Sequence, residues 1–182
     1  MISFAELIKQ RQSVRKYQSV PVPEKLINQC IEAIRLAPSA SNSQPWHIIV
    51  VNDPEKKQKI AEATITKGIP INKFAFEAPV IVVIVVEQPK TITKIASWLK
   101  KRDFPWIDLG IAAEHFCLQA TELGLGTCMI GWFDEKKVKH ILHIPSYKRV
   151  GLLITLGYPP PDYPIREKHR KIFKQICSYN HY

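Results

Sequence analysis

The sequence lacks any hydrophobic run long enough to cross a lipid bilayer. Its longest apolar run, residues 78–86, falls well short of the roughly 20 residues that a transmembrane helix needs. The first residues, Met1 to Glu6, show no basic region followed by an apolar core, so no secretory signal peptide is evident. We therefore expect a cytoplasmic protein with no membrane partner. Its 182 residues suffice for one domain, over residues 1–182, with a sizeable core.

The sequence also lacks the usual signatures of a self-sufficient catalyst. It shows no Ser/His/Asp set, no metal-ligand spacing, no carboxylate pair for acid–base work and no GxGxxG dinucleotide motif. No CxxC is present, and the cysteines are widely spaced, three of them in apolar, helix-like patterns. We interpret them as reduced core thiols rather than zinc ligands or a disulfide framework. The four cysteines are Cys30, Cys117, Cys128 and Cys177.

Negative charge is scarce, because 16 acidic residues face 26 lysines and arginines, for a net charge of +10. A nucleic-acid binder is one interpretation, and it predicts steeply salt-dependent DNA affinity. The basic residues are dispersed along the chain, however, and most fall where amphipathic helices would be solvated. A solvated basic surface with no nucleic-acid partner is therefore the favoured interpretation, and a phosphorylated cofactor would use only a few of the charges.

Hydrophobic periodicity predicts a mixture of helices and strands. Helices are predicted at residues 2–10, from Pro23 toward Pro38, at 54–65, at 107–123 and from Asp134 to His140. Strands are predicted at residues 46–51, 78–86 and 150–156. The strand at 78–86 is β-branched without alternation, which favours a central strand covered on both faces. Residues 87–106 carry Trp98 and Trp106 without a clear pattern, and ordinary aromatic packing is favoured there over a pocket cover.

A polar turn links the second predicted helix to the first predicted strand. Pro38 and Pro45 stiffen its two ends, because each lacks a backbone N–H and has a restricted φ. Between them lie short hydrogen-bonding side chains, suited to holding a ligand. On the stretch alone, a surface turn that satisfies its own backbone is the favoured interpretation. Those side chains are Ser39, Ser41, Asn42, Ser43 and Gln44.

Two basic stretches near the chain ends are candidates for one anion site. Arg11, Ser13 and Arg15 alternate, so an extended backbone would present them on one side. Two guanidiniums and a hydroxyl suit a phosphate, because arginine offers a planar fork of donors. The basic tail at residues 166–171 would bring further cations to the same anion, with Ile172, Phe173 and Ile176 following at helical spacing. An exposed basic turn and a solvated tail are the alternatives.

A glycine-containing block, residues 124–133, follows the long predicted helix. Gly124 is placed to end that helix in a left-handed conformation. Gly126 and Gly131 would let backbone approach a flat ligand without side-chain obstruction. No strand is expected ahead of this block.

Taken together in this order, four blocks resemble the nitroreductase family of flavoproteins. With the helix at Asp108, they cover nearly the whole chain. The blocks are Arg11-x-Ser-x-Arg15, residues 37–46 (APSASNSQPW), residues 123–131 (LGLGTCMIG), and residues 156–159 (LGYP) with the basic tail.

The resemblance implies an α+β fold with a mixed, mainly antiparallel central sheet flanked by helices, in an intertwined homodimer. It implies FMN at the dimer interface, touched by both subunits. Arg11, Ser13 and Arg15 would hold the ribityl phosphate, joined by Lys168 and Arg170 from the tail. The flavin would carry the redox chemistry, which accounts for an enzyme with no evident nucleophile or base.

At the ring end, the resemblance implies contacts from two segments. The backbone of Ile130 and Gly131 would approach the flavin near its reactive nitrogen. The residues that would lie against the isoalloxazine are Pro38, Ser39, Ala40 and Ser41 of a second copy. Larger members carry an Asn and a Lys ahead of the central strand that contact flavin, and Asn72 and Lys73 lie in the equivalent region.

The activity implied is an oxidoreductase that takes a hydride from NADH or NADPH onto FMN and passes it to a nitroaromatic, a quinone or a similar acceptor. The chain is short, so the segment that shapes the acceptor pocket in larger members is expected to be reduced. Two alternatives stay open. One is a specialised flavoenzyme of the same fold, dehalogenase-like or flavin-fragmenting. The other is a flavin-binding protein without catalysis.

Overall fold

The computed structural model describes residues 2–65, 71–88 and 102–182 as an α+β fold around a four-stranded sheet. The strands are β1 (Trp46–Val51), β2 (Val80–Val86), β3 (Gly126–Ile130) and β4 (Arg149–Gly157). Their order is β1-β2-β4-β3, and every neighbouring pair is antiparallel. A parallel bridge joins Ser13 to Thr127 at the β3 edge, so the expected mixed, mainly antiparallel sheet is confirmed.

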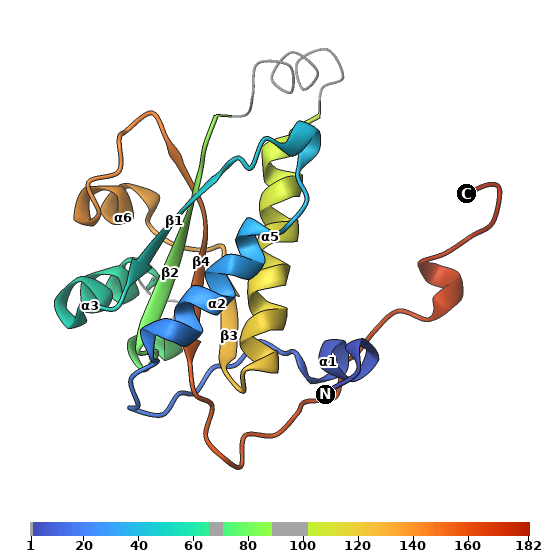
Figure 1. Cartoon of the computed structure of the whole chain (residues 1–182), viewed down its shortest axis with the longest axis horizontal. Coiled ribbons are helices and arrows are strands. Elements are labelled where there is room, and N and C mark those ends of the chain that lie inside the picture. The colour runs from blue at the N-terminus through green and yellow to red at the C-terminus, as the bar shows by residue number, and fades with distance from the viewer. Residues whose placement is uncertain (1, 66–70, 89–101) are drawn as a thin grey trace.

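Helices cover both faces of this sheet (Figure 1). Helices α2 (Glu24–Arg35) and α5 (Phe104–Glu122) pack on one face, and α3 (Pro54–Ala63) and α6 (Glu135–Ile141) on the other. The short elements are α1 (Phe4–Gln10) and three 3₁₀ turns, η1 (Ala40–Asn42), η2 (Lys73–Phe76) and η3 (Phe173–Gln175). None of the helices in the described residues is long and apolar enough to span a membrane.

Strand β2 explains why the sheet needs two covered faces. Ile81, Val83 and Val85 join the core under α3 and α6, whereas Val80, Val82 and Ile84 join the core under α2 and α5. Successive strand residues point to opposite faces, so an unbroken apolar run requires apolar partners on both sides. The prediction of a central strand covered on both faces is therefore confirmed.

The predicted helix ends are close to the observed ones. Ser3 begins α1 with a capping box, in which its hydroxyl accepts from the Glu6 N–H and the Glu6 carboxylate accepts from the Ser3 N–H. Asp134 caps α6 by accepting from the Lys137 N–H at 3.0 Å. Gly124 follows α5 with φ +75°, as expected for a left-handed helix end.

Two local predictions were wrong, and a third falls largely outside the described residues. The block after Gly124 contains a strand, β3, which was not predicted, and Cys128 lies in it. The helical spacing at residues 172–176 yields only the 3₁₀ turn η3, whose apolar side chains are exposed. Of the 87–106 segment, residues 89–101 lie outside the described residues, and α5 begins at Phe104.

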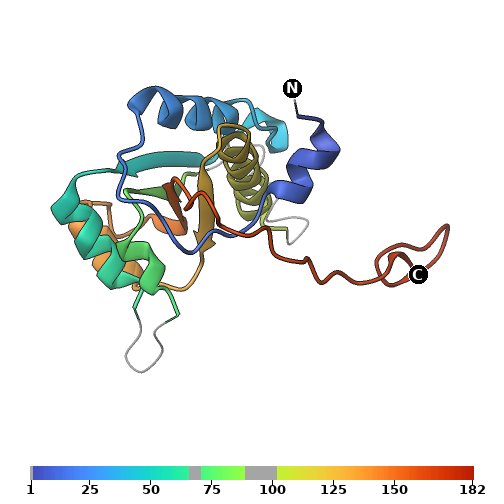
Figure 2. The same cartoon turned by 90° about the horizontal axis from the view of Figure 1, so that it is seen from below.

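The C-terminal tail leaves the body of the fold. After β4 it passes α1, close to the N-terminal segment, and then extends away from the helices and sheet (Figure 2). Residues 8–13 and 164–168, which are far apart in sequence, therefore lie side by side near β3, whereas the two termini lie far apart.

Gly126 is required by packing, which corrects the expectation that it faces a ligand. A Cβ at this position would lie 2.7 Å from Val14 Cγ2, so the Val14 side chain occupies the space that the glycine leaves. This close approach lets the segment after α1 lie directly on β3.

Gly126→Ala should therefore destabilise the protein by about 1–3 kcal/mol, because overpacking a filled site forces neighbouring atoms to move. Urea unfolding measures the effect. Gly110→Ala is the matched control, since no atom lies within 4 Å of the added Cβ. Gly110 is an exposed position of α5, and alanine there should stabilise by about 0.5–1 kcal/mol. Equal unfolding midpoints for Gly126→Ala and the wild type would contradict this account.

Candidate functional site

The segment after α1 lies on the edge strand β3 in an extended conformation. The Val14 N–H donates to the Thr127 carbonyl at 2.8 Å, and Ser13 forms the parallel bridge to Thr127. Val14 points inward and is buried, while Arg15 is exposed and Ser13 half-buried. The alternation expected from the sequence is thus realised, with the two residues flanking Val14 directed away from the core.

The tail runs beside this segment and is hydrogen-bonded to it. The Gln12 side-chain amide donates from Nε2 to the Pro164 carbonyl at 2.9 Å and accepts at Oε1 from the Arg166 N–H at 3.0 Å. Arg166 also donates from Nη2 to the Ser13 carbonyl. These hydrogen bonds therefore hold together two segments that are about 150 positions apart in sequence.

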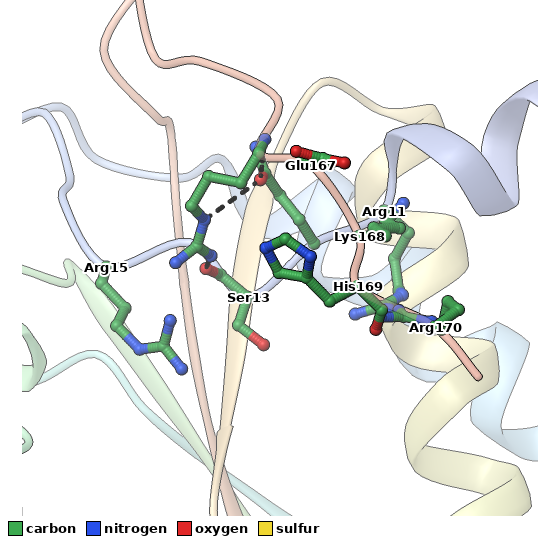
Figure 3. A pocket seen from close by; sticks show the side chains of 9 residues that line it. Arg11, Ser13, Arg15, Glu167, Lys168, His169 and Arg170 are labelled. Atoms are coloured by element: carbon green, nitrogen blue, oxygen red, sulfur yellow. Dashed lines mark hydrogen bonds between the residues drawn. The ribbon is translucent and has the colours of Figure 1, made fainter.

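The two segments enclose a cavity of about 330 Å³ (Figure 3). Its wall carries five lysines and arginines and one carboxylate, which gives it a strong excess of positive charge. All five residues predicted for a phosphate site line it. The lining residues are Arg11, Gln12, Ser13, Arg15, Arg166, Glu167, Lys168, His169 and Arg170.

The cations of this cavity are anchored by partners at its rim. Arg11 Nε lies 3.1 Å from the Glu114 carboxylate of α5. Lys168 Nζ donates to the carbonyls of Ile8, at 3.1 Å, and Lys9, which are orphan acceptors at the C-terminal end of α1. These partners fix where the side chains lie without cancelling the excess charge.

Electrostatic repulsion inside the cavity is evident at Lys168. Partial desolvation, followed by the nearby Arg11 and Arg170 charges, lowers the pKa of the Lys168 ammonium, and the Glu114 carboxylate only partly opposes them. An anion within the cavity would favour the protonated lysine and relieve this repulsion. The cavity is therefore suited to a small, highly charged anion such as a phosphate group.

A buried thiol lies beneath the cations, in β3. Burial raises the pKa of the Cys128 thiol, while the Arg15 charge and a hydrogen bond with Ser13 act in the opposite direction. Burial also raises the pKa of Cys30 and of Cys117 to about 12. All four cysteines are free, and these three are buried, in agreement with their interpretation as core thiols. The same interpretation was wrong for Cys177, which is half-buried in the tail, where the described residues form no core around it.

The end of β3 offers an open stretch of backbone. Ile130 is buried, but in the described part of the chain no atom beyond the adjoining residues lies within 4 Å of the position that a Cβ on Gly131 would occupy, and Trp132 is 59% exposed. The Asn72 side chain donates to the Trp132 carbonyl and to the Thr64 carbonyl, both at 3.2 Å. Asn72 therefore tethers the loop that follows β3, a role that its sequence position did not indicate.

The Pro38–Ser41 turn does not line the cavity. It sits at the N-terminal end of α5, where the Ala40 N–H donates to both carboxylate oxygens of the buried Asp108 at 3.1 Å. Ser41, Asn42 and Gln44 have φ values of 52°, 49° and 48°, in the left-handed region that non-glycine residues seldom occupy. The fold thus holds a strained turn in place, and its assignment to the flavin of a second copy stays a prediction.

Sequence reasoning assigned no role in the anion site to four residues that line the cavity, Gln12, Arg166, Glu167 and His169. Arg166 belongs to the basic tail, but only Lys168 and Arg170 were assigned to the anion. Gln12 stands between two predicted site residues, and nothing in its type or spacing distinguishes it from an exposed glutamine. Its role becomes visible only when the tail lies beside it.

The chain matches the model of the nitroreductase family over residues 8–158. It is 33% identical over 159 residues to a putative NADH dehydrogenase/NAD(P)H nitroreductase of Methanothermobacter thermautotrophicus, covering 85% of this chain and 76% of that protein. It is 29% identical to an NADH dehydrogenase of Thermus thermophilus, covering 93% and 92% of the two chains. The fold is similar to that of an FMN-dependent nitroreductase from Clostridium difficile, with a TM-score of 0.77, 28% identity and coverage of 98% and 100%.

Asp108→Ala should weaken the anchor of the strained turn and destabilise the protein by about 1–3 kcal/mol, because it removes a buried charged acceptor. Hydrogen exchange at residues 39–44 should accelerate along with the loss of unfolding free energy in urea. Asp108→Asn keeps one acceptor oxygen and should lose less. If both variants exchange and unfold like the wild type, Asp108 does not hold the turn.

Proposed function

The chain belongs to the nitroreductase family, and we propose that it is an FMN-dependent oxidoreductase formed by one domain over residues 1–182. It takes a hydride from NADH or NADPH and passes it to a nitroaromatic, a quinone or a similar acceptor. The names of its relatives support the nicotinamide donor, and the C. difficile nitroreductase supports FMN. The observation that carries the proposal is the cationic cavity between the two ends of the chain.

The cavity fits the phosphate end of FMN. Arg11, Arg15 and Arg170 supply guanidinium donors, and Ser13 supplies a hydroxyl, which together match the acceptor oxygens of a phosphate. Lys168 already donates to two carbonyls of α1, so its contribution is largely its charge. The single carboxylate of the wall, Glu167, leaves the cavity positive.

Strand β3 connects this phosphate end with the proposed ring end. Thr127 lies beside Ser13, and Ile130 is three residues further along the strand. At about 3.3 Å per residue, that separation is about 10 Å, which is comparable to an extended ribityl phosphate. The open backbone at Gly131 is where the flat ring would meet the protein without side-chain obstruction.

Bound FMN supplies the two-electron redox chemistry, so the protein needs no nucleophile of its own. The chain's task is to bind the phosphate, to present unobstructed backbone at Ile130 and Gly131, and to hold the Pro38–Ser41 turn in one shape. The Asp108 carboxylate and the stiff prolines of the turn serve that last requirement.

A second copy of the chain completes this proposal as a homodimer. Helix α1 has no buried residue, and its Phe4 and Ile8 side chains are 67% and 45% exposed. The tail exposes Ile172, Phe173 and Ile176 to a similar degree. Apolar side chains on two extended outer segments are suited to burial against a partner, as in obligate dimers.

The purified protein should carry flavin, and anaerobic addition of NADH or NADPH should bleach its visible absorbance because the nicotinamide reduces the bound FMN. A nitroaromatic or a quinone should then restore the absorbance. The control is the same titration with riboflavin added to a protein of unrelated fold. A protein that neither retains nor takes up FMN, or a yellow protein that neither nicotinamide bleaches, would overturn the proposed function.

Arg15→Ala should weaken FMN binding by on the order of 2 kcal/mol, because it removes a charge-assisted hydrogen bond to the phosphate. That loss corresponds to a roughly 30-fold higher Kd. Fluorescence titration of the apoprotein with FMN measures it. Lys16→Ala removes the same charge from the adjacent exposed residue, which lies outside the cavity lining, and should change the Kd little. Equal affinities for the two variants would remove Arg15 from the phosphate site.

A further inference from the structure

We propose that Gln12 is a positioning residue that clasps the C-terminal tail onto the site and thereby makes the protein select FMN over flavin without a phosphate. The inference rests on the proposed function. Gln12 acts through the tail cations that it holds in place rather than as a principal phosphate ligand.

The clasp consists of a single side-chain amide that serves two backbone groups of the tail. Its NH₂ group donates to the Pro164 carbonyl at 2.9 Å, and its carbonyl oxygen accepts from the Arg166 N–H at 3.0 Å. The Pro164 carbonyl and the Arg166 N–H are two residues apart on an extended segment, and a neighbouring β-strand would pair with the same two groups. Among side chains, only an amide offers a donor and an acceptor in this arrangement without carrying a charge.

Arg166 extends the clasp on the other side. Its guanidinium donates from Nη2 to the Ser13 carbonyl and from Nε to Gln12 Oε1, the latter at 3.4 Å. Two residues further on, Lys168 reaches the carbonyls of Ile8 and Lys9 at the end of α1. Residues 8–13 and 164–168 are therefore fastened at several points, and Gln12 lies at the centre of this contact.

The clasp adds to other contacts that hold the tail at this place, such as the hydrogen bond that the Arg15 N–H donates to the Tyr163 hydroxyl at 3.0 Å. Pro164, Ile165 and Arg166 are exposed, and they belong to no helix or strand. The tail also brings Arg166, Lys168 and Arg170 up to Arg11 and Arg15, so like charges repel across the contact. Neutral hydrogen bonds from Gln12 oppose that repulsion without cancelling any of the positive charge that a phosphate would use.

Gln12→Ala should therefore raise the Kd for FMN about tenfold or more and leave the Kd for riboflavin within about twofold. Gln12→Glu retains an acceptor but loses the donor to Pro164 and adds a negative charge, so it should also weaken FMN selectively. Gln10→Ala, at an exposed glutamine outside the cavity lining, is the matched control. Fluorescence titration of each full-length apoprotein with both flavins measures the FMN-to-riboflavin preference.

Limited trypsin digestion tests the clasp without flavin. Cleavage after Arg166, Lys168 and Arg170, followed by mass spectrometry, should be several-fold faster in Gln12→Ala than in the wild type or Gln10→Ala. Circular dichroism of each variant identifies any global unfolding, and Gln12→Glu provides a second variant if the alanine protein does not fold.

The outcomes separate the inference from the function on which it rests. A wild-type protein with no preference for FMN over riboflavin overturns the proposed phosphate site. A wild-type preference that Gln12→Ala and Gln12→Glu both retain, or equal weakening of the two flavins, overturns the role of Gln12 alone. Unchanged trypsin cleavage of the tail in the variants overturns the clasp.

Discussion

The site depends on one short backbone pairing, between the segment after α1 and the edge strand β3. The Val14 N–H bonds the Thr127 carbonyl at 2.8 Å, and the Val14 side chain fills the space beside Gly126. This contact sets the position of Arg11, Ser13 and Arg15, because residues on either side of a buried valine must point outward. The tail is then hydrogen-bonded to the outer side of that segment. The cavity therefore depends on three segments in turn: strand β3, the segment after α1 that pairs with it, and the tail that pairs with that segment.

Like charges gathered at one place are unfavourable without a ligand, and the fold limits this cost rather than removing it. Glu114 holds Arg11, and the orphan carbonyls of α1 hold Lys168. Both contacts lie at the rim, so the middle of the cavity keeps its positive potential. Among the lysines and arginines in the described residues, five line the cavity and the others lie elsewhere, so the net charge of +10 does not belong to this site alone.

The molecule divides into a rigid body and two outer segments with different tasks. The sheet and its covering helices bury an apolar core on each face, which gives β3 and α5 fixed positions. Helix α1 and the tail bury little, although they carry many of the cations and exposed apolar side chains. The proposed phosphate site and the proposed contact with a second copy both use these outer segments, so we expect the two to be coupled.

The sequence by itself determined the elements whose apolar residues follow a clear helical or strand pattern. The β-branched run of β2 and the apolar stripe of α2 and α5 are local patterns, and the caps Ser3 and Asp134 are local hydrogen bonds. The alternation of Arg11, Ser13 and Arg15 likewise follows from extended backbone. These features need no information about distant residues, and the family resemblance added the choice of Lys168 and Arg170 from the tail and the identity of the anion as the ribityl phosphate.

Tertiary structure decided the remainder, because it depends on contacts between residues far apart in sequence. Strand β3 is short and begins at a glycine, with Thr127 and Ile130 as its only β-branched residues, and its pairing with β4 on one edge and with the Ser13 segment on the other makes it a strand. Gly126 is explained by Val14, and Gln12 by Pro164 and Arg166, which no local pattern relates. The tail forms no α-helix despite its apolar spacing, since within the described chain nothing packs against that face to stabilise one.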